Sequence, residues 1–115
     1  MLEKIGIGID IVNIEKFREL KYDSNKEFYK KIFSPSEIKY CLKYSNPSQH
    51  FSGKFAIKEA VIKSIKMKIP INKIITDHVG KKPIVCIKNN SDYFFIVSLS
   101  HDKDYAIAVV LSEKI

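Results

Sequence analysis

Two carboxylates and one lysine stand in patterns that suit a metal ion and a phosphate. Asp10 ends the short run GIGID, and Glu59 and Lys63 lie one helical turn apart in the stretch GKFAIKEAVIK. Mg²⁺ takes one or two protein carboxylates and shares phosphate oxygens with its substrate, so a carboxylate beside a packed helix face and ammonium groups suits that ion. The plainer interpretations are that Asp10 caps a turn or a helix and that Glu59 and Lys63 form an ordinary i,i+4 pair.

The helix that carries Glu59 has an almost wholly apolar or small circumference. On a helical wheel its apolar arc consists of Phe51, Phe55, Ile57, Val61, Ile62 and Ile65. Lys58 falls inside this arc, and its long stem could carry the ammonium out to water. Such a helix is expected to be packed on more than one side, which brings its charges close to the core.

The element that positions Asp10 is a predicted strand over residues 4–11, where isoleucine alternates with glycine. Gly6 and Gly8 leave one face of this strand bare, so another backbone or a ligand can approach closely. Asn13 is expected to cap a helix that runs to about residue 21.

The middle of the chain is predicted to be helical. After a short apolar patch at residues 28–33, the run SPSE predicts a helix over residues 34–44, because its serine can cap, its proline suits the first turn and its glutamate completes a capping box. The longest helix is expected from about residue 49 to residue 67, and Pro70 ends it.

The last third of the chain changes to apolar, β-branched runs separated by turns. These runs predict strands over residues 71–78, 83–88, 93–100 and 105–111, joined by tight links and therefore antiparallel. The predicted fold class is α+β. A single domain over residues 1–115 would pack one long helix and shorter helices on a small, mostly antiparallel sheet.

Composition restricts the partners and the location of the chain. Its 115 residues carry a net charge of +7, which favours an anionic partner such as a phosphate, a nucleic acid or an acidic protein, although AT-rich codon usage would also enrich lysine. No run of 18 apolar residues and no signal-peptide pattern occur, so a cytoplasmic protein without a membrane span is expected. Cys41 and Cys86 are too few for a disulfide framework and are expected to be small buried residues.

Four stretches together resemble the short 4′-phosphopantetheinyl transferases, the holo-[acyl-carrier-protein] synthases. They read GIGIDIVNIEKF, FSPSE, SGKFAIKEAVIK and VSLSHDKDYAIAVV, and they occur in the family's order over nearly the whole chain. The resemblance implies the fold of that family and the transfer of 4′-phosphopantetheine from coenzyme A to a serine of acyl carrier protein. Adenosine 3′,5′-bisphosphate would be released, and the carrier would be activated for fatty acid synthesis.

The resemblance also assigns roles to individual residues. Asp10 and Glu59 are the implied Mg²⁺ ligands, and with Lys63, which is implied to meet the phosphates, they form the expected catalytic set. Contacts with coenzyme A are implied for Lys54, Lys58, Lys63, Lys82, Pro83 and His101. The base that accepts the serine proton stays open between Glu59 acting through a metal-bound water and bulk water.

The chain departs from the family pattern in three places. The turn GKKP is one residue longer than the family's Gly-Lys-Pro turn, which leaves Gly80 without an assigned role. Ile96 stands where the family often has another histidine. Lys54 stands where arginine is common, and a lysine cannot grip phosphate with a bidentate fork.

The chain is also expected to form an oligomer. The strands FFIVSLS and YAIAVVLS carry nearly continuous apolar runs, and one layer of helices is too little to cover both faces of their sheet, so a second subunit is expected there. The resemblance specifies a homotrimer, with coenzyme A bound in the cleft between neighbouring subunits.

Other interpretations fit parts of the sequence. A nucleic-acid-binding module agrees with the charge, but no known motif occurs and Arg18 is the only arginine available for base readout. A non-catalytic scaffold of the same fold would not need an intact set of site residues. His50 and His78 are expected to lie at a loop or strand end without partners. The basic residues Lys16, Arg18, Lys21 and Lys26 are either a landing face for the acidic carrier or an ordinary solvated helix face.

Overall fold

The computed structural model describes residues 2–115, and it confirms the predicted α+β class. A single-turn helix η1 (Leu2–Lys4) comes before the first strand, and two more such turns, η2 (Tyr22–Ser24) and η3 (Ile71–Lys73), occur later. The main elements follow in the order β1 (Ile5–Asn13), α1 (Glu15–Glu19), α2 (Lys26–Ile32), α3 (Pro35–Leu42), α4 (Pro47–Ser64), β2 (Ile74–Val79), β3 (Lys82–Ile87), β4 (Tyr93–His101) and β5 (Tyr105–Lys114). Within residues 2–115, no helix is both long and apolar enough to cross a bilayer.

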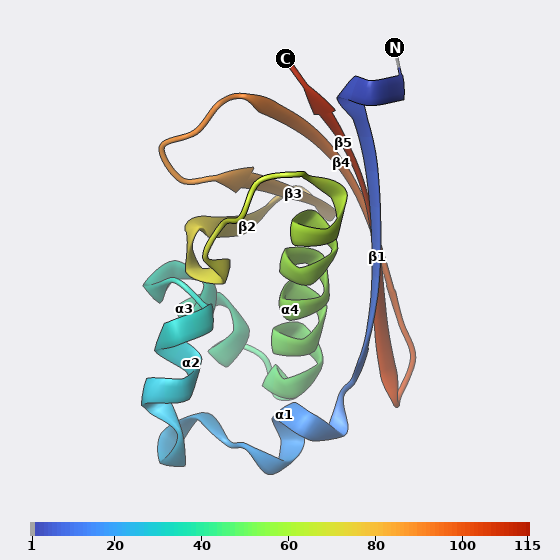
Figure 1. Cartoon of the computed structure of the whole chain (residues 1–115). Helices are drawn as coiled ribbons and strands as arrows, with labels where there is room; N and C mark the ends of the chain where they lie inside the picture. The colour runs from blue at the N-terminus through green and yellow to red at the C-terminus, as the bar shows by residue number, and fades with distance from the viewer. Residues whose placement is uncertain (1) are drawn as a thin grey trace.

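The strands are antiparallel, as predicted, but they divide between two sheets. The larger sheet has the order β1-β5-β4, which brings the two ends of the chain side by side, and β2 and β3 form a separate hairpin. Helix α4 runs along the inner face of the larger sheet, between that sheet and the shorter helices α2 and α3 (Figure 1). The long helix therefore has neighbours on opposite sides, which explains why its circumference is almost wholly apolar.

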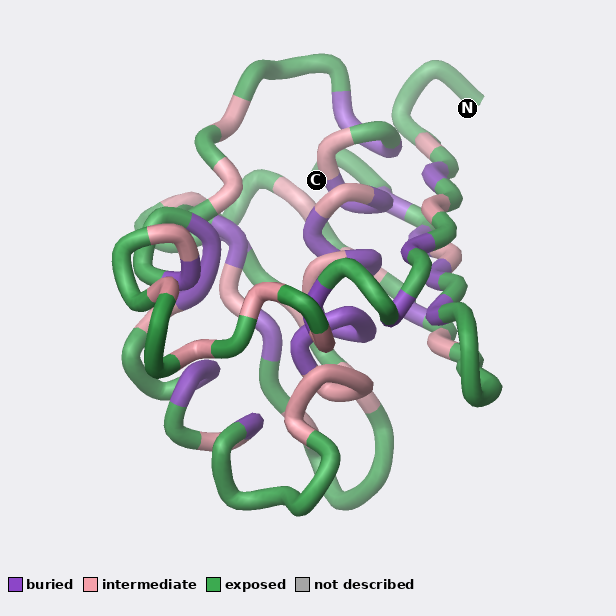
Figure 2. Tube along the Cα trace, turned by 90° about the horizontal axis from the view of Figure 1, so that it is seen from below, coloured by how far each residue is buried: buried purple, intermediate pink, exposed green. Residues whose placement is uncertain are grey.

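The larger sheet has one covered face and one bare face. Buried positions alternate with exposed ones along its strands, and the purple of buried residues concentrates on α4 and on alternate strand positions (Figure 2). The outer face carries exposed apolar side chains from all three strands: Ile5, Ile7, Ile9, Ile11, Phe94, Ile96, Ile107 and Leu111. Exposed fractions on β1 reach 66% at Ile7, so this face is an apolar patch that residues 2–115 leave uncovered.

At Gly6 and Gly8, helix α4 lies directly against the backbone of β1. A Cβ atom built on Gly6 would lie 1.7 Å from the carbonyl oxygen of Ser64, and one built on Gly8 would lie 1.9 Å from that of Ala60. Both distances are far inside van der Waals contact, so only glycine fits at either position. The close approach that the bare strand face predicted is therefore made by a helix backbone.

Several helix boundaries differ from the predicted ones. The capping box of α3 is confirmed, because the Ser34 side chain accepts from the Glu37 amide and the Glu37 side chain accepts from the Ser34 amide. Helix α1 has only five residues, although Asn13 does accept a hydrogen bond from Glu15 as a capping residue would. Helix α4 ends at residue 64 rather than 67, because Ile65 turns into extended backbone and inserts into the core.

An aromatic cluster joins the short helices to the start of α4. Phe51 of α4 packs with Tyr29 and Phe33 at ring-centroid distances of 4.6 and 5.0 Å, and Phe17 of α1 stacks on it at 6.4 Å. All four rings are at least 98% buried. The apolar patch at residues 28–33, which had no assigned element, is thus helix α2 and a major part of the core.

Replacing Gly8 by alanine tests the backbone contact. We expect Gly8→Ala to lower the free energy of unfolding by about 3 kcal/mol, because α4 or β1 must move to admit the methyl group. Gly80→Ala is the control. Gly80 has a φ of 63° but open space around it. Gly80→Ala therefore adds only backbone strain, which should lower the free energy of unfolding by about 1 kcal/mol. Urea denaturation measures both variants, and equal losses would contradict a close contact at Gly8.

Candidate functional site

Asp10 and Glu59 line one groove. Asp10 comes from β1 and Glu59 from α4, and the glycines of β1 allow these two elements to lie close enough for both carboxylates to reach the same space. The groove has a volume of about 350 Å³, and its other lining residues are Ile11, Val12, Asn13, Lys16 and Phe55. Both carboxylates are half-buried, so they remain accessible to a ligand in the groove.

Lys63 reaches the same carboxylate from the next turn of α4. Its Nζ donates to Asp10 Oδ1 at 3.0 Å and to the carbonyl oxygen of Ile9 at 3.0 Å. The lysine side chain is 52% exposed and that of Asp10 is 16% exposed. Lys63 thus pairs across to the strand rather than along its own helix with Glu59, and its ammonium keeps a third hydrogen for an incoming anion.

The donor set of this groove suits Mg²⁺. Two carboxylates supply hard oxygen ligands, and Mg²⁺ ordinarily completes its six positions with waters and substrate phosphates. Within residues 2–115, no three His, Cys, Asp or Glu side chains gather into a larger metal-binding group. A two-carboxylate site is compatible with a magnesium ion that binds together with a phosphate substrate.

A second groove brings together three of the other predicted residues. Lys54 of α4, Pro83 of β3 and His101 of β4 line it. Its remaining lining residues are Tyr40, Gln49, His50, Gly53, Ile57, Thr76, Asp77, His78 and Leu99. Lys82 is exposed at the start of β3 and does not line this groove.

Lys54 is a buried cation that has no carboxylate partner among the described residues. It is 5% exposed, its Nζ donates to Thr76 Oγ1 at 3.0 Å, and the ammonium lies 4.6 Å from the centre of the Tyr40 ring. Among the described residues, no carboxylate oxygen lies close enough to Lys54 Nζ to form an ion pair, for which the limit is 4.0 Å. Burial lowers the pKa of Lys54, because the interior disfavours the charged form. An anion in the groove would supply the missing counter-charge.

Lys58 contradicts both of its predicted roles. Its side chain is 0% exposed, so the ammonium does not reach water. Nζ donates to Glu37 Oε1 at 2.7 Å and to the carbonyl oxygens of Ile32 and Ile74 at 2.8 and 2.6 Å. An ammonium has only three hydrogens, and all of them are used inside the protein. Lys58 therefore has none left for a phosphate of coenzyme A, and it is the cation of a fully buried ion pair with Glu37.

Glu37 is the residue whose importance the sequence did not reveal. It was expected only to complete a capping box, yet it is 1% exposed and joins α3 to β2 and α4. Burial by itself would raise the pKa of Glu37, but the Lys58 ammonium and hydrogen bonds from Thr76 and Ser34 hold it below its ordinary value. The signal in the sequence was a lysine inside an apolar arc, which requires a partner of opposite charge.

His50 and His78 also differ from their expected isolation. The His50 ring stacks on Tyr44 at a centroid distance of 3.8 Å, and the His78 ring stacks on Tyr40 at 4.7 Å. Burial lowers the pKa of both imidazoles, and nearby Lys54 lowers it further. Both rings line the groove of Lys54, so they belong to the candidate site.

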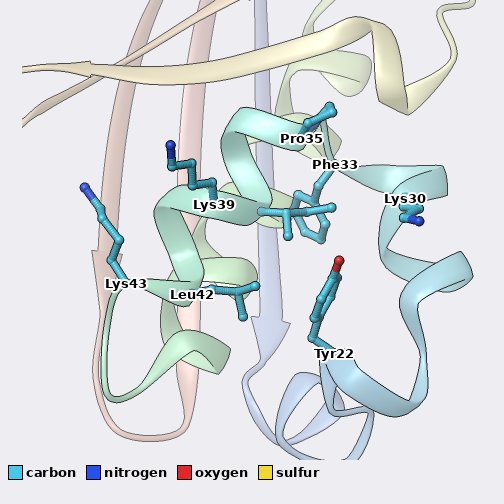
Figure 3. A pocket seen from close by; sticks show the side chains of 8 residues that line it. Tyr22, Lys30, Phe33, Pro35, Lys39, Leu42 and Lys43 are labelled. Carbon is cyan, nitrogen blue, oxygen red and sulfur yellow. The ribbon is translucent and has the colours of Figure 1, made fainter.

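The largest described cavity lies elsewhere. It has a volume of about 650 Å³ and opens between α2 and α3, with Leu42 and Tyr22 pointing into it (Figure 3). Its other lining residues are Lys30, Phe33, Pro35, Ile38, Lys39 and Lys43. None of the predicted site residues lies there, so cavity size does not identify the site in this protein.

Comparisons with known proteins identify the family. The family model described as the 4′-phosphopantetheinyl transferase superfamily matches residues 6–110. The chain belongs to this superfamily. The resemblance seen in the sequence is therefore confirmed, and the matched residues include both grooves.

Individual relatives agree with the family model. A holo-[acyl-carrier-protein] synthase of Ehrlichia ruminantium (strain Gardel) is 41% identical over 96% of this chain and 97% of its own length. One from Thermodesulfovibrio yellowstonii is 35% identical over 92% of this chain and 96% of its own length.

Solved structures of this transferase superfamily share the fold. The holo-(acyl-carrier-protein) synthase of Bacillus anthracis, in complex with CoA (3′,5′-ADP), superposes with a TM-score of 0.80 at 26% identity over 96% of both chains. The Helicobacter pylori holo-[acyl-carrier-protein] synthase in complex with coenzyme A gives 0.77 at 29% identity, over 93% of this chain and 99% of the other. These matches confirm the predicted fold.

Replacing Lys58 tests its structural role. We expect Lys58→Met to lower the free energy of unfolding by about 3–5 kcal/mol, because it leaves the Glu37 carboxylate buried without its cation. Lys68→Met is the matched control, since Lys68 is exposed just beyond α4 and should change stability by less than about 0.5 kcal/mol. Urea denaturation followed by circular dichroism measures both. If the two variants are equally stable, Lys58 is not the core cation described above.

Proposed function

We propose that this chain is a Mg²⁺-dependent holo-[acyl-carrier-protein] synthase, which transfers 4′-phosphopantetheine from coenzyme A to a serine of acyl carrier protein. The observation that carries the proposal is the groove that Asp10 and Glu59 both line, together with the hydrogen bond from Lys63 to Asp10. Family membership and relatives of the same name over nearly the full length support the reaction class.

In this proposal Asp10 and Glu59 hold the metal. Bound Mg²⁺ would neutralise charge on the pyrophosphate of coenzyme A and so assist displacement at phosphorus. Lys63 orients Asp10 through their 3.0 Å contact, and its free hydrogen can be donated to a phosphate oxygen. Phosphoryl transfer depends mainly on positioning and charge stabilisation, which these three side chains can provide.

The second groove has a volume of about 40 Å³, so we assign to it an anionic group of coenzyme A and not the rest of the molecule. Lys54 is the strongest candidate for a phosphate contact, because its buried ammonium has hydrogens to spare and no carboxylate within ion-pair distance among residues 2–115. Pro83 and His101 line the same groove, and exposed Lys82 is the residue directly before Pro83 in β3. Complexes of two structural relatives with coenzyme A support a binding site for this substrate.

The chemistry balances without a further reactant. The serine oxygen of the carrier forms a bond to the phosphorus that bears pantetheine, and the bond from that phosphorus to the bridging oxygen breaks. Adenosine 3′,5′-bisphosphate leaves with the electron pair. The serine proton is lost to a base, for which Glu59 acting through a water is the candidate in this groove.

We also propose that the active form is a homotrimer, for which the exposed sheet face supports an oligomer and the family resemblance alone supplies the number three. The outer face of the larger sheet exposes Ile7, Ile9 and Ile11 by about 60% each, and Ile96 and Leu111 continue the patch onto neighbouring strands. Asp10 lies on the strand that carries most of this patch, so a neighbouring subunit seated there would lie close to the metal groove.

The carrier and the compartment complete the proposal. An acidic carrier would meet the basic residues near α1, of which Arg18 and Lys21 line a groove of about 400 Å³. We assign the reaction to the cytoplasm, in agreement with Cys41 and Cys86, which are free thiols as in proteins of reducing compartments. Cys41 is buried as predicted, whereas the prediction was wrong for Cys86, which is exposed on β3.

Removing either carboxylate tests the metal site. We expect Asp10→Asn and Glu59→Gln to remain folded and to lose transfer activity by about 100-fold or more, because each removes a charged ligand while keeping the side-chain volume. Asp92→Asn, which alters an exposed loop carboxylate, should keep wild-type turnover. Transfer of labelled pantetheine to apo carrier protein at limiting Mg²⁺ measures all three. Near wild-type turnover in both site variants would show that these residues do not hold the metal.

A charge on the outer sheet face tests the trimer. We expect Ile9→Glu to dissociate the oligomer into folded subunits of 13.3 kDa, because a buried unpaired carboxylate is costly at an apolar interface. Val79→Glu is the control, since Val79 is 66% exposed on the β2-β3 hairpin, away from that face. Sedimentation velocity at micromolar concentration reports the state. A wild-type chain that is an active monomer would disprove the homotrimer.

A further inference from the structure

Glu37 and Thr76 form a hydrogen-bond relay that ends at Lys54. Glu37 Oε2 accepts from the Thr76 amide at 2.8 Å and from Thr76 Oγ1 at 2.6 Å, and Thr76 Oγ1 accepts from Lys54 Nζ at 3.0 Å. Every member is at least 95% buried. The relay links α3, β2 and α4, which are separate in sequence.

The direction of this relay is fixed by its chemistry. A carboxylate only accepts and an ammonium only donates, so the single hydroxyl hydrogen of Thr76 must point to Glu37 and its lone pair must face Lys54. Hydrogen bonds in such a chain polarise one another, so the carboxylate makes the Thr76 oxygen a better acceptor. Thr76 is the only side chain in residues 2–115 that hydrogen-bonds the Lys54 ammonium.

The charge of Glu37 does not cancel that of Lys54. Glu37 Oε1 is already bound to Lys58 at 2.7 Å and to the Ser34 amide at 2.8 Å, so the carboxylate has its own dedicated counter-ion. Lys54 is thus held by a neutral hydroxyl while its positive charge stays available. Two of its three hydrogens have no protein acceptor among the described residues.

We infer that Glu37, acting through Thr76, is a positioning residue that aims the Lys54 ammonium at an anionic group of coenzyme A. This inference rests on the proposed function, in which Lys54 contacts a phosphate. A lysine stem is flexible and lacks the rigid fork of arginine, so a fixed acceptor at one corner of the ammonium compensates for that freedom. The Tyr40 ring, 4.6 Å from the ammonium, restricts it on another side.

Thr76→Val tests the relay, because it keeps the shape and the backbone amide that binds Glu37 while removing the hydroxyl. We expect KM for coenzyme A to rise about tenfold, as for loss of one hydrogen bond to a charged group, while kcat is unchanged. Thr76→Ser restores a hydroxyl and should restore KM. Ser112→Ala is the control. It removes another buried hydroxyl, which donates to the carbonyl oxygen of Ser64 at the C-terminal end of α4, and it should leave KM unchanged.

The decisive comparison is a double-mutant cycle with Lys54→Ala. If Thr76 acts through Lys54, Thr76→Val raises KM in the wild-type chain and has no further effect in Lys54→Ala. Equal KM increases in both backgrounds, or no increase in either, would overturn the relay while Lys54→Ala alone still shows the phosphate contact. If Lys54→Ala leaves KM unchanged, the proposed role of Lys54 fails, and the relay with it. Should Thr76→Val not fold, Thr76→Cys, with its weak donor and acceptor, is expected to raise KM to a smaller extent.

Discussion

The contact between the backbone of α4 and the backbone of β1 is the constraint on which the rest of the structure depends. Gly6 and Gly8 have no side chains, so the helix settles directly onto the strand near Ser64 and Ala60. That approach brings Glu59 into the same groove as Asp10 and allows Lys63 to reach across to the strand. A side chain at either glycine would separate two elements that must jointly supply the carboxylates.

The lysines of α4 show how environment divides one residue type into separate roles. Lys58 is wholly buried and uses every hydrogen inside the protein, so it stabilises the core with Glu37. Lys54 is nearly as buried but lacks a carboxylate partner in the described chain, so its charge is available to a ligand. Lys63 is half-exposed and pairs with Asp10. Burial and hydrogen-bond count, rather than net charge, distinguish a structural lysine from one that can bind phosphate.

The sequence predicted features that depend on local chemistry. The sequence predicted which segments form strands from their periodicity. It predicted the capping box at Ser34 and the close approach at Gly8 from single residue types. What it could not predict depends on distant partners: the Glu37–Lys58 ion pair joins residues 21 apart, and the stacking of His78 on Tyr40 joins residues 38 apart. Net charge was likewise unable to separate a transferase from a nucleic-acid-binding module, whereas the resemblance of four stretches to a known family was sufficient.

Direct detection of the bound ion is the sharpest test of the metal groove. Mn²⁺ serves as a paramagnetic substitute for Mg²⁺, and electron paramagnetic resonance can count the ions bound in the presence of coenzyme A. The arrangement of Asp10 and Glu59 in one groove predicts one Mn²⁺ per subunit, displaced by excess Mg²⁺ and lost in both Asp10→Asn and Glu59→Gln. Retention of the same bound ion by both folded variants would contradict the assignment of this groove as the metal site.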